Sequence, residues 1–308
     1  MRAIWSPSKL ALPVLLCACI LEAGEGRGLV IGTNTYRGAS ERDQLHFCEK
    51  DADDVAEYLR AKQGFQDVTV LKSPAGGEIE KALVALAERA ATGDRVFVYY
   101  SGHGVQVKDA SGDEGDKLDE ALLGSDLKPI IDDRLGQLVA AIVARTPDVA
   151  VVFDCCFSGT AMKAFGTGTP GTEASYFRAK YTRTEDFGDL GEAEVNTVVR
   201  RVNESASGTG SSGGQAPVDG SQGGYVFLAA ASEYEVAFEY EARRQSAFTH
   251  YFLQGLGDGK ADLNGDGVVT FEEMRQYTQA GLAQAGLPQP QHPTLEGQRS
   301  GASLQPLF

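Results

Sequence analysis

The sequence predicts an α/β fold with a mostly parallel sheet flanked by helices. Two short apolar runs, 95–100 and 149–153, are rich in β-branched and aromatic residues, as buried strands of parallel sheets are. Segments with apolar residues at helical spacing separate the predicted strands, which is the pattern of crossover connections. With 308 residues, 42% of them hydrophobic, the chain is long enough to bury one large core.

Strands and helices are expected to alternate along the chain. We predict strands over 27–34, 68–71, 95–100, 149–153 and 225–231, and helices over 51–60, 78–91, 132–145 and 248–256. Gly64 favours the end of the first helix, because glycine readily takes the left-handed conformation that follows many helices. In the second helix Ile79, Leu83 and Leu86 recur at helical spacing and form one apolar face. Consecutive strands joined by helices pair in parallel, so an α/β architecture follows.

The chemically reactive side chains come directly after two of the predicted strands. One strand is followed by Asp154, Cys155 and Cys156, and another by Ser101 and then by His103 between two glycines. The carboxyl ends of parallel strands meet at one edge of the sheet, where ligands bind. A neighbouring imidazole helps a thiol to form its thiolate, so this edge is predicted to hold a nucleophilic site.

The segments Tyr-Ser-Gly-His-Gly and Asp-Cys-Cys-Phe-Ser-Gly resemble the His and Cys motifs of caspase-like cysteine peptidases, most closely those of metacaspases and their bacterial relatives. The resemblance covers nearly everything after residue 26. It implies a Cys156 nucleophile, a His103 base, and an oxyanion held by the N–H groups of Gly104 and Cys156. Side-chain alternation turns Cys155 to the opposite face, where we expect it to pack as a small apolar residue.

The resemblance also implies one catalytic domain made from two pieces of the chain. Residues 24–159 are the predicted large-subunit-like part, and residues 225–308 the small-subunit-like part. Between them, 160–224 is rich in Gly, Ser, Thr and charge, which predicts a flexible surface insertion or linker.

The substrate pocket implied by the resemblance is acidic. Its positions in metacaspases correspond here to Asp51, Asp154, Ser101 and Cys48. Two carboxylates in a partly buried pocket favour Arg or Lys before the cleaved bond. True caspases hold Asp with Arg and Gln, and because Leu45 and Asp154 stand at those positions here, aspartate specificity is disfavoured.

Self-processing within the insertion is a further expectation, because a protease can grip a flexible segment that contains basic residues. The basic residues are Lys163, Arg178, Lys180, Arg183, Arg200 and Arg201. The alternative is a catalytically silent caspase-like module that binds a partner or calcium. The intact Cys and His motifs favour the endopeptidase.

Calcium is the expected metal, at an EF-hand-like loop over 262–273. Oxygen ligands stand at loop positions one, three, five, seven, nine and twelve, and Gly267 stands at position six. These ligands are Asp262, Asn264, Asp266, Val268, Thr270 and Glu273. We expect a structural role, with a metal-free turn of the same shape as the alternative.

A second acidic group resembles the activating calcium site of some metacaspases. It comprises Asp113, Glu114, Asp116, Asp119, Asp132 and Asp133. Lys163 stands where the family has an acid, which argues against calcium there, and Phe157 replaces the His that commonly follows the nucleophile.

The first 23 residues predict a signal peptide. Arg2 and Lys9 precede an apolar run over 10–21, which is short for a membrane span. Cleavage near residue 23 and lipid attachment at Cys19 both fit, and both predict an exported protein that is periplasmic, lipid-anchored or secreted and has no transmembrane helix once mature. An uncleaved helix or a misassigned start is the alternative, and a misassigned start would make the protein cytoplasmic.

Three cysteines would remain after export, Cys48, Cys155 and Cys156. This odd number leaves at least one thiol unpaired, and no disulfide framework is expected. The formal net charge of −15 argues against nucleic acid as a partner, because binding phosphates requires a basic patch. The expected partners are peptide or protein substrates with basic residues. The oligomeric state stays open.

Overall fold

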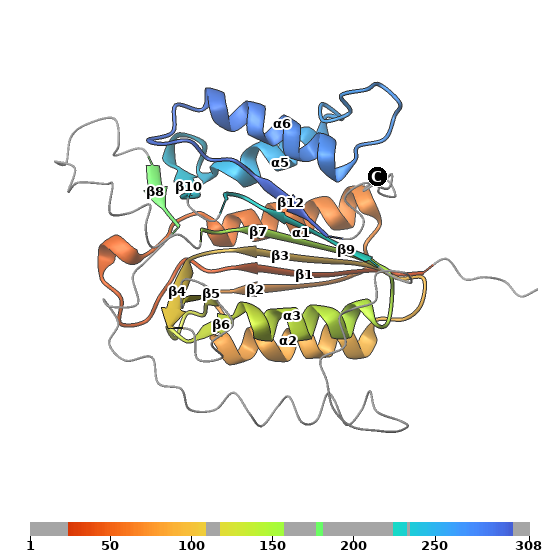
Figure 1. Cartoon of the computed structure of the whole chain (residues 1–308), viewed down its shortest axis with the longest axis horizontal. Coiled ribbons are helices and arrows are strands. Elements are labelled where there is room, and N and C mark those ends of the chain that lie inside the picture. Colours follow the sequence, from red (N-terminus) through yellow and green to blue (C-terminus); the bar gives the residue numbers. More distant parts are fainter. Residues whose placement is uncertain (1–23, 109–117, 157–176, 181–223, 233–234, 298–308) are drawn as a thin grey trace, which may run out of the picture.

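The computed structural model describes residues 24–108, 118–156, 177–180, 224–232 and 235–297. Within these residues a six-stranded sheet forms the centre, in the order β12-β9-β7-β3-β1-β2 (Figure 1). Its strands are β1 (Gly26–Gly32), β2 (Asp67–Lys72), β3 (Arg95–Ser101), β7 (Asp148–Asp154), β9 (Gly224–Ala229) and β12 (Thr294–Glu296). All neighbours pair in parallel except β12, which runs antiparallel to β9. The α/β fold class with a parallel-dominated sheet is therefore confirmed.

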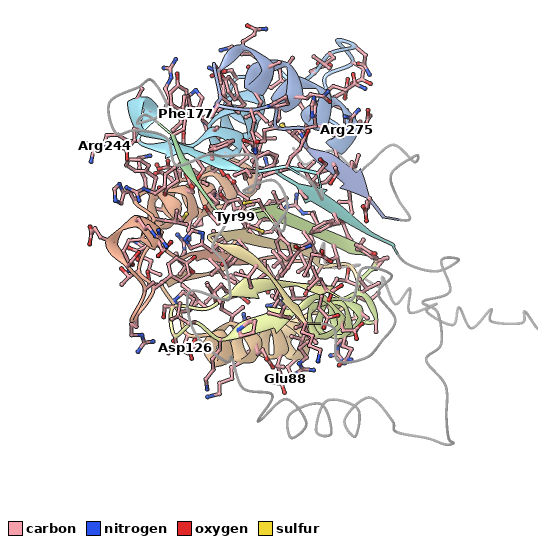
Figure 2. All side chains as sticks on the ribbon, turned by 60° about the vertical axis from the view of Figure 1, so that its left-hand side comes forward. Glu88, Tyr99, Asp126, Phe177, Arg244 and Arg275 are labelled. Carbon is pink, nitrogen blue, oxygen red and sulfur yellow. The ribbon has the colours of Figure 1, made fainter. Side chains whose placement is uncertain are left out.

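Helices cover both faces of this sheet (Figure 1). One face carries α2 (Gly76–Arg89) and α3 (Asp132–Val143), and the other carries α1 (Cys48–Gln63), α5 (Ala247–Gly257) and α6 (Phe271–Gln284). The side chains of the strands alternate between the two cores that result. In β3, Val96 and Val98 join the α2 and α3 side, and Phe97 and Tyr99 join the other. Figure 2 shows side chains filling the space between the layers, and Tyr99 is labelled among them.

Two small antiparallel sheets lie at the carboxyl edge of the large one. The first contains β4 (Gly104–Lys108), β5 (Leu118–Leu123) and β6 (Pro129–Ile131). The second contains β8 (Phe177–Ala179), β10 (Phe238–Tyr240) and β11 (Gln245–Ser246). Short 3-10 turns, η1 (Glu41–Asp43) and η5 (Glu241–Arg243), complete the described elements.

The sequence did not predict β4 to β6 or α6, and it placed the start of α1 three residues too late. Five residues of the predicted insertion are described, 177–180 and Gly224, and they do not form a loose loop. Residues 177–179 form β8, Lys180 is buried, and Gly224 begins β9. The domain boundaries stay a prediction, although β9 from the small part pairs directly with β7 from the large part.

No helix among the described residues is long and apolar enough to cross a membrane. The predicted signal segment, 1–23, lies outside these residues, so export stays a prediction.

Gly32 allows the end of β1 to approach the start of α1. A Cβ atom at this position would lie 2.1 Å from the carbonyl oxygen of Cys48, which is backbone and cannot move aside cheaply. This close approach fixes the first turn of α1, which carries Asp51. The absence of a side chain at Gly32 therefore positions part of the carboxyl edge.

We expect Gly32→Ala to lower the free energy of unfolding by more than about 2 kcal/mol, because overpacking against rigid backbone is costly. The matched control is Gly136→Ala in α3, where a Cβ meets nothing within 4 Å. Removing a helical glycine there should stabilise the protein by up to about 1 kcal/mol. Urea unfolding of both variants measures the difference, and equal stabilities would contradict the tight approach.

Candidate active site

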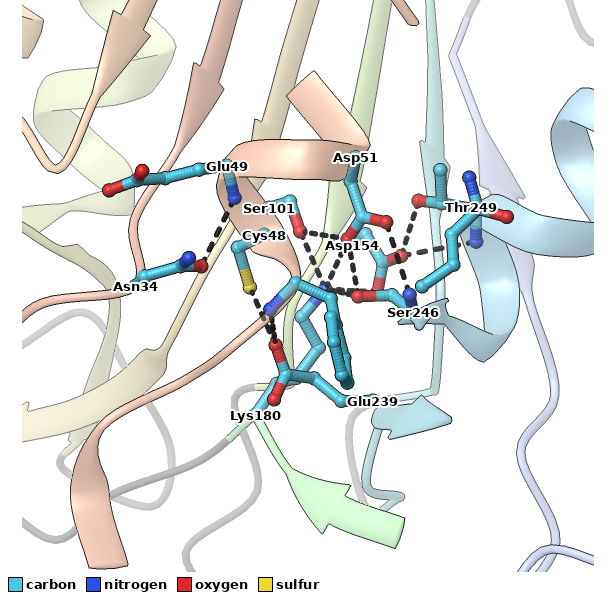
Figure 3. Close-up of polar contacts among 12 residues, drawn as sticks. Asn34, Cys48, Glu49, Asp51, Ser101, Asp154, Lys180, Glu239, Ser246 and Thr249 are labelled. Atoms are coloured by element: carbon cyan, nitrogen blue, oxygen red, sulfur yellow. Dashed lines mark hydrogen bonds and ion pairs between the residues drawn. The ribbon is translucent and has the colours of Figure 1, made fainter. Parts of the chain in front are cut away.

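The acidic pocket predicted from the sequence assembles at the carboxyl edge of the sheet. Ser101 and Asp154 are directly opposite each other at the ends of β3 and β7. Asp51 reaches them from the first turn of α1. Its carboxylate accepts a hydrogen bond of 2.9 Å from the hydroxyl of Ser101. All three residues are buried, so the edge presents two carboxylates away from water (Figure 3).

The pocket holds a lysine from the same chain. Lys180 Nζ lies 2.8 Å from Asp154 Oδ1 and 4.0 Å from Asp51 Oδ2. It also donates hydrogen bonds of 2.8 Å to the hydroxyls of Ser101 and Ser246. Lys180 is completely buried, and Figure 3 shows its contacts converging with those of the carboxylates. The pocket therefore binds a primary ammonium group through charge and hydrogen bonds together.

Two pocket residues that the sequence reading missed come from the small part. Ser246 donates its backbone N–H and its hydroxyl to Asp51, at 3.1 and 2.5 Å. Thr249 does the same for Asp154 Oδ2, at 3.2 and 2.6 Å. Both lie at the start of α5, where helix N–H groups favour negative charge. Serine and threonine just before an apolar helix were the available signal.

The electrostatics of the pocket depend on burial and on the lysine. Burial raises the pKa of Asp51 to about 7, the nearby charge of Lys180 opposes the rise, and Asp154 adds to it. Burial alone would lower the pKa of Lys180, but the attraction of Asp154, Cys48 and Asp51 together outweighs this effect and raises that pKa. The lysine is therefore held as a cation.

Cys48 lies beside this pocket but contacts another carboxylate. Its thiol is 3.6 Å from Glu239 Oε1 on β10. Burial raises the pKa of Cys48 well above the usual value for a thiol. Of the four predicted pocket residues, Asp51, Asp154 and Ser101 contact one another or the lysine, and Cys48 stands next to them.

His103 is held in place by the loop that follows β1. Its Nε2 is 2.7 Å from the carbonyl oxygen of Asp43, and its backbone N–H donates to Tyr36 Oη at 2.7 Å. The ring of Tyr36 packs against the imidazole with centroids 4.7 Å apart. Nδ1 is buried and has no hydrogen-bond partner among the described residues. This nitrogen is the one left for proton transfer.

The two cysteines of the motif separate as side-chain alternation predicts. Cys155 packs in the core beneath α2 and α3, whereas Cys156 belongs to the core on the opposite face. Burial raises the pKa of Cys156 to about 12 and lowers that of His103 to about 4. With the lysine docked, the thiol and the imidazole are therefore both neutral at pH 7.

The backbone of Lys180 lies between Gly104 and Ala237. Gly104 donates its N–H to the carbonyl oxygen of Lys180 at 3.2 Å, and Lys180 donates its own N–H to Ala237 at 2.9 Å. The Lys180 backbone also opposes the rise that burial causes in the pKa of Cys156. The carbonyl before the bond between residues 180 and 181 thus reaches one of the two predicted oxyanion donors.

The predicted calcium loop lies directly before α6. The carboxylate of Asp262 accepts hydrogen bonds from the backbone N–H groups of Gly265, Asp266 and Gly267. The carboxylate of Glu273 accepts hydrogen bonds from the backbone N–H and the hydroxyl of Thr270, the residue before α6. Across the described parts of the chain, no group of three or more His, Cys, Asp or Glu side chains is placed to hold a metal ion. Calcium here stays a prediction.

Several predicted positions lie outside the described residues. They include Phe157 and, from the acidic group, Asp113, Glu114 and Asp116. The basic residues Lys163, Arg183, Arg200 and Arg201 also lie outside them. Asp119, Asp132 and Asp133 lie within β5 and the first turn of α3.

The fold and the residues at the carboxyl edge of the large sheet place the protein in a known class. The family model described as "Caspase domain" matches residues 25–299, so the chain belongs to the caspase-domain family of peptidases. Metacaspase-7 of Arabidopsis thaliana is 38% identical over 143 residues, which cover 43% of this chain and 34% of that protein. Metacaspase-1 of Candida glabrata is 28% identical over 209 residues, which cover 58% and 52%. The chain therefore spans about a third to a half of these relatives.

Solved structures support the fold. A protein from Geobacter sulfurreducens superposes with a TM-score of 0.60 at 22% identity, covering 89% of this chain and 93% of the other. Caspase-1 from Spodoptera frugiperda gives a TM-score of 0.55 at 14% identity, with 89% and 86% covered. At these identities the likeness shows the fold alone.

We predict that the docked Lys180 segment shields the Cys156 thiol from solvent. In Lys180→Ala the segment loses its contacts with both carboxylates, and we expect iodoacetamide to modify Cys156 roughly tenfold faster or more, because solvent access and ionisation both favour thiol reactivity. Lys260→Ala, which removes an exposed lysine paired with Asp258, is the control. Peptide mapping with fragment-ion sequencing distinguishes Cys156 from the other cysteines, the adjacent Cys155 included, and equal rates in all three proteins would refute the shielding.

Proposed function

We propose that this protein is a cysteine endopeptidase that cleaves after Lys or Arg and processes its own chain after Lys180. The observation that carries the proposal is the position of that residue. Its ammonium group pairs with Asp154, while its carbonyl oxygen accepts the N–H of Gly104. A substrate requires the same two contacts, because one selects the side chain and the other polarises the bond to be cut.

In the proposed mechanism, His103 removes the proton from the thiol of Cys156 through Nδ1. Sulfur attacks the carbonyl carbon of Lys180, and the oxygen that gains negative charge is held by backbone N–H groups, including that of Gly104. The C–N bond to residue 181 then breaks, and the imidazolium returns the proton to the leaving amine. Water hydrolyses the thioester and restores the thiol.

Asp43 supports this cycle through its backbone. Its carbonyl oxygen, 2.7 Å from Nε2 of His103, stabilises the proton on that nitrogen and leaves Nδ1 as the base. The same carbonyl favours the imidazolium that forms during the reaction, as an acceptor does for a catalytic imidazole in general. The dyad therefore needs no third side chain.

The pocket chemistry supports basic side chains over acidic ones. Asp51 and Asp154 are both buried, and a substrate carboxylate would add a third negative charge to them. Like charges brought together away from water repel strongly. An aspartate before the cleaved bond is therefore excluded by the same groups that attract lysine.

We expect the purified full chain to convert to two fragments with a new terminus at residue 181, and Cys156→Ala to stay intact. Lys180→Arg should retain this cleavage, because both side chains are cations of similar reach. Lys180→Asp should reduce it by a factor of about 100 or more, given the cost of an unpaired buried charge. Intact mass spectrometry distinguishes these results.

Reporter peptides complete the test of self-processing. A wild-type chain that remains uncut and turns over no Lys or Arg reporter would be a silent module instead. Fragments that form equally in Cys156→Ala would show that another protease makes the cut.

The pH dependence of substrate binding follows from Asp51. Its pKa is raised to about 7 while a lysine fills the pocket, so the carboxyl is protonated below that pH and ionised above it. Ionisation strengthens the attraction for a cation. We therefore expect KM for a lysine reporter to fall as pH rises through about 7, by roughly tenfold in total.

Asp51→Asn is the matched variant for this pH profile, because it keeps the shape of the side chain and removes its titration. Its KM should be high and nearly constant from pH 6 to pH 8. A wild-type KM that is also constant over this window would rule out Asp51 as the titrating group.

A further inference from the structure

We infer that the cleft recognises four residues in the order aromatic, basic, small and basic, with Tyr240 and Glu239 as specificity-determining residues. The inference rests on the proposed function, because it takes the segment 177–180 as the pattern of a substrate. Counting back from the cut, Lys180 is the first position, Ala179 the second, Arg178 the third and Phe177 the fourth.

The segment binds by extending a sheet. β8 pairs antiparallel with β10, with Ala179 opposite Phe238 and Phe177 opposite Tyr240 (Figure 1). The backbone N–H of Lys180 continues the pairing to the carbonyl of Ala237. Backbone pairing of this kind accepts many sequences, so the discrimination must come from side chains, which point alternately to the two faces.

At the third position Arg178 meets a buried carboxylate. Its Nε is 3.8 Å from Glu239 Oε2, and its Nη1 donates to the carbonyl oxygen of Arg42 at 3.1 Å. Glu239 is completely buried. In the described parts of the chain, Arg178 is the only Lys or Arg with a nitrogen within 4 Å of that carboxylate. Arg178 therefore adds a cation beside a carboxylate on which the charges of Lys180 and His46 also act.

Backbone donors hold Glu239 in this position. The N–H groups of His46 and Phe47 donate to its carboxylate at 2.8 and 2.6 Å. These contacts aim the carboxylate without neutralising its charge. An acidic residue at the third position of a substrate would face it directly, so the same group attracts basic residues and rejects acidic ones.

At the fourth position Phe177 packs on two aromatic rings. Its ring centroid is 5.0 Å from that of Tyr240 and 6.3 Å from that of Phe238. Figure 2 shows Phe177 at the end of β8 away from the large sheet. Aromatic pairs in this distance range stabilise a contact beyond simple burial.

The second position is restricted by the core. Ala179 faces Phe238, a buried residue, and packs against the core cluster on that side of the sheet. A larger side chain would have to displace packed groups, which is costly. Small residues are therefore favoured there.

The test uses four capped fluorogenic peptides on the full chain and on its Lys180→Ala variant. In this variant the chain's own Lys180 no longer competes with the peptide for the two carboxylates. The peptides are Phe-Arg-Ala-Lys, Phe-Ala-Ala-Lys, Phe-Glu-Ala-Lys and Ala-Arg-Ala-Lys. We expect kcat/KM to be highest for the first, about fivefold lower without the arginine, and about threefold lower without the phenylalanine. The glutamate peptide should be the poorest.

Variants of the enzyme assign the preferences to residues. Glu239→Gln should bring the arginine and alanine peptides to within about twofold of each other, whereas general damage would lower both and preserve their ratio. Tyr240→Ala should remove the preference for phenylalanine, and Tyr240→Phe should keep it. Glu241→Gln is the matched control, since Glu241 pairs with His46 instead of the docked segment.

Each outcome separates this inference from the proposed function. Equal kcat/KM for all four peptides, with efficient turnover, would overturn the four-residue recognition and leave the lysine-specific peptidase in place. An arginine preference that survives Glu239→Gln would overturn the role of that residue. No turnover of any peptide by either form of the chain would overturn the proposed function and this inference with it.

Discussion

The ion pair between Lys180 and Asp154 is the interaction on which the closed cleft depends. Two carboxylates buried close together are costly to fold, because each loses water and repels the other. The ammonium group offsets this cost at 2.8 Å from Asp154, and Ser246 and Thr249 satisfy further oxygen atoms. The groups that meet around this one cation come from both the large and the small part.

Burial also sets the charge state of His103 and Cys156, the two residues proposed to carry out catalysis. It lowers the pKa of His103 and raises that of Cys156, so neither group is charged while the lysine occupies the pocket. A neutral thiol is a poor nucleophile and is slow to oxidise. In the proposed mechanism, proton transfer to Nδ1 of His103 would therefore accompany attack by the Cys156 sulfur.

Much of the fold and the site could be predicted from local sequence. The apolar runs before Ser101 and Asp154 indicated adjacent parallel strands, whose carboxyl ends necessarily meet, and alternation separated Cys155 from Cys156. The hydrogen bonds from Ser246 to Asp51 could not be predicted, because the two residues are 195 positions apart in the sequence.

Strand β8 was beyond sequence reasoning for a different reason. Three residues are too few to show a periodic pattern of apolar side chains. Their pairing with β10 depends on contacts with residues distant in the sequence and not on their own β propensity. Glu239 was missed in the same way, since an acid within a short apolar stretch shows its role only when its burial and its partners are known.

The position of Lys180 in the chain determines how occupancy of the acidic pocket responds when the protein is diluted. It follows Cys156 by 24 residues, so the lysine that fills the pocket is tethered to the nucleophile's own strand. A cut after Lys180 would leave that tether intact, and the new carboxyl end would return to the cleft as a unimolecular event. Its effective concentration is set by the length of the tether, on the order of millimolar for a short flexible link. Lowering the protein concentration would therefore not empty the pocket, and an external substrate must compete with a ligand that never leaves the molecule.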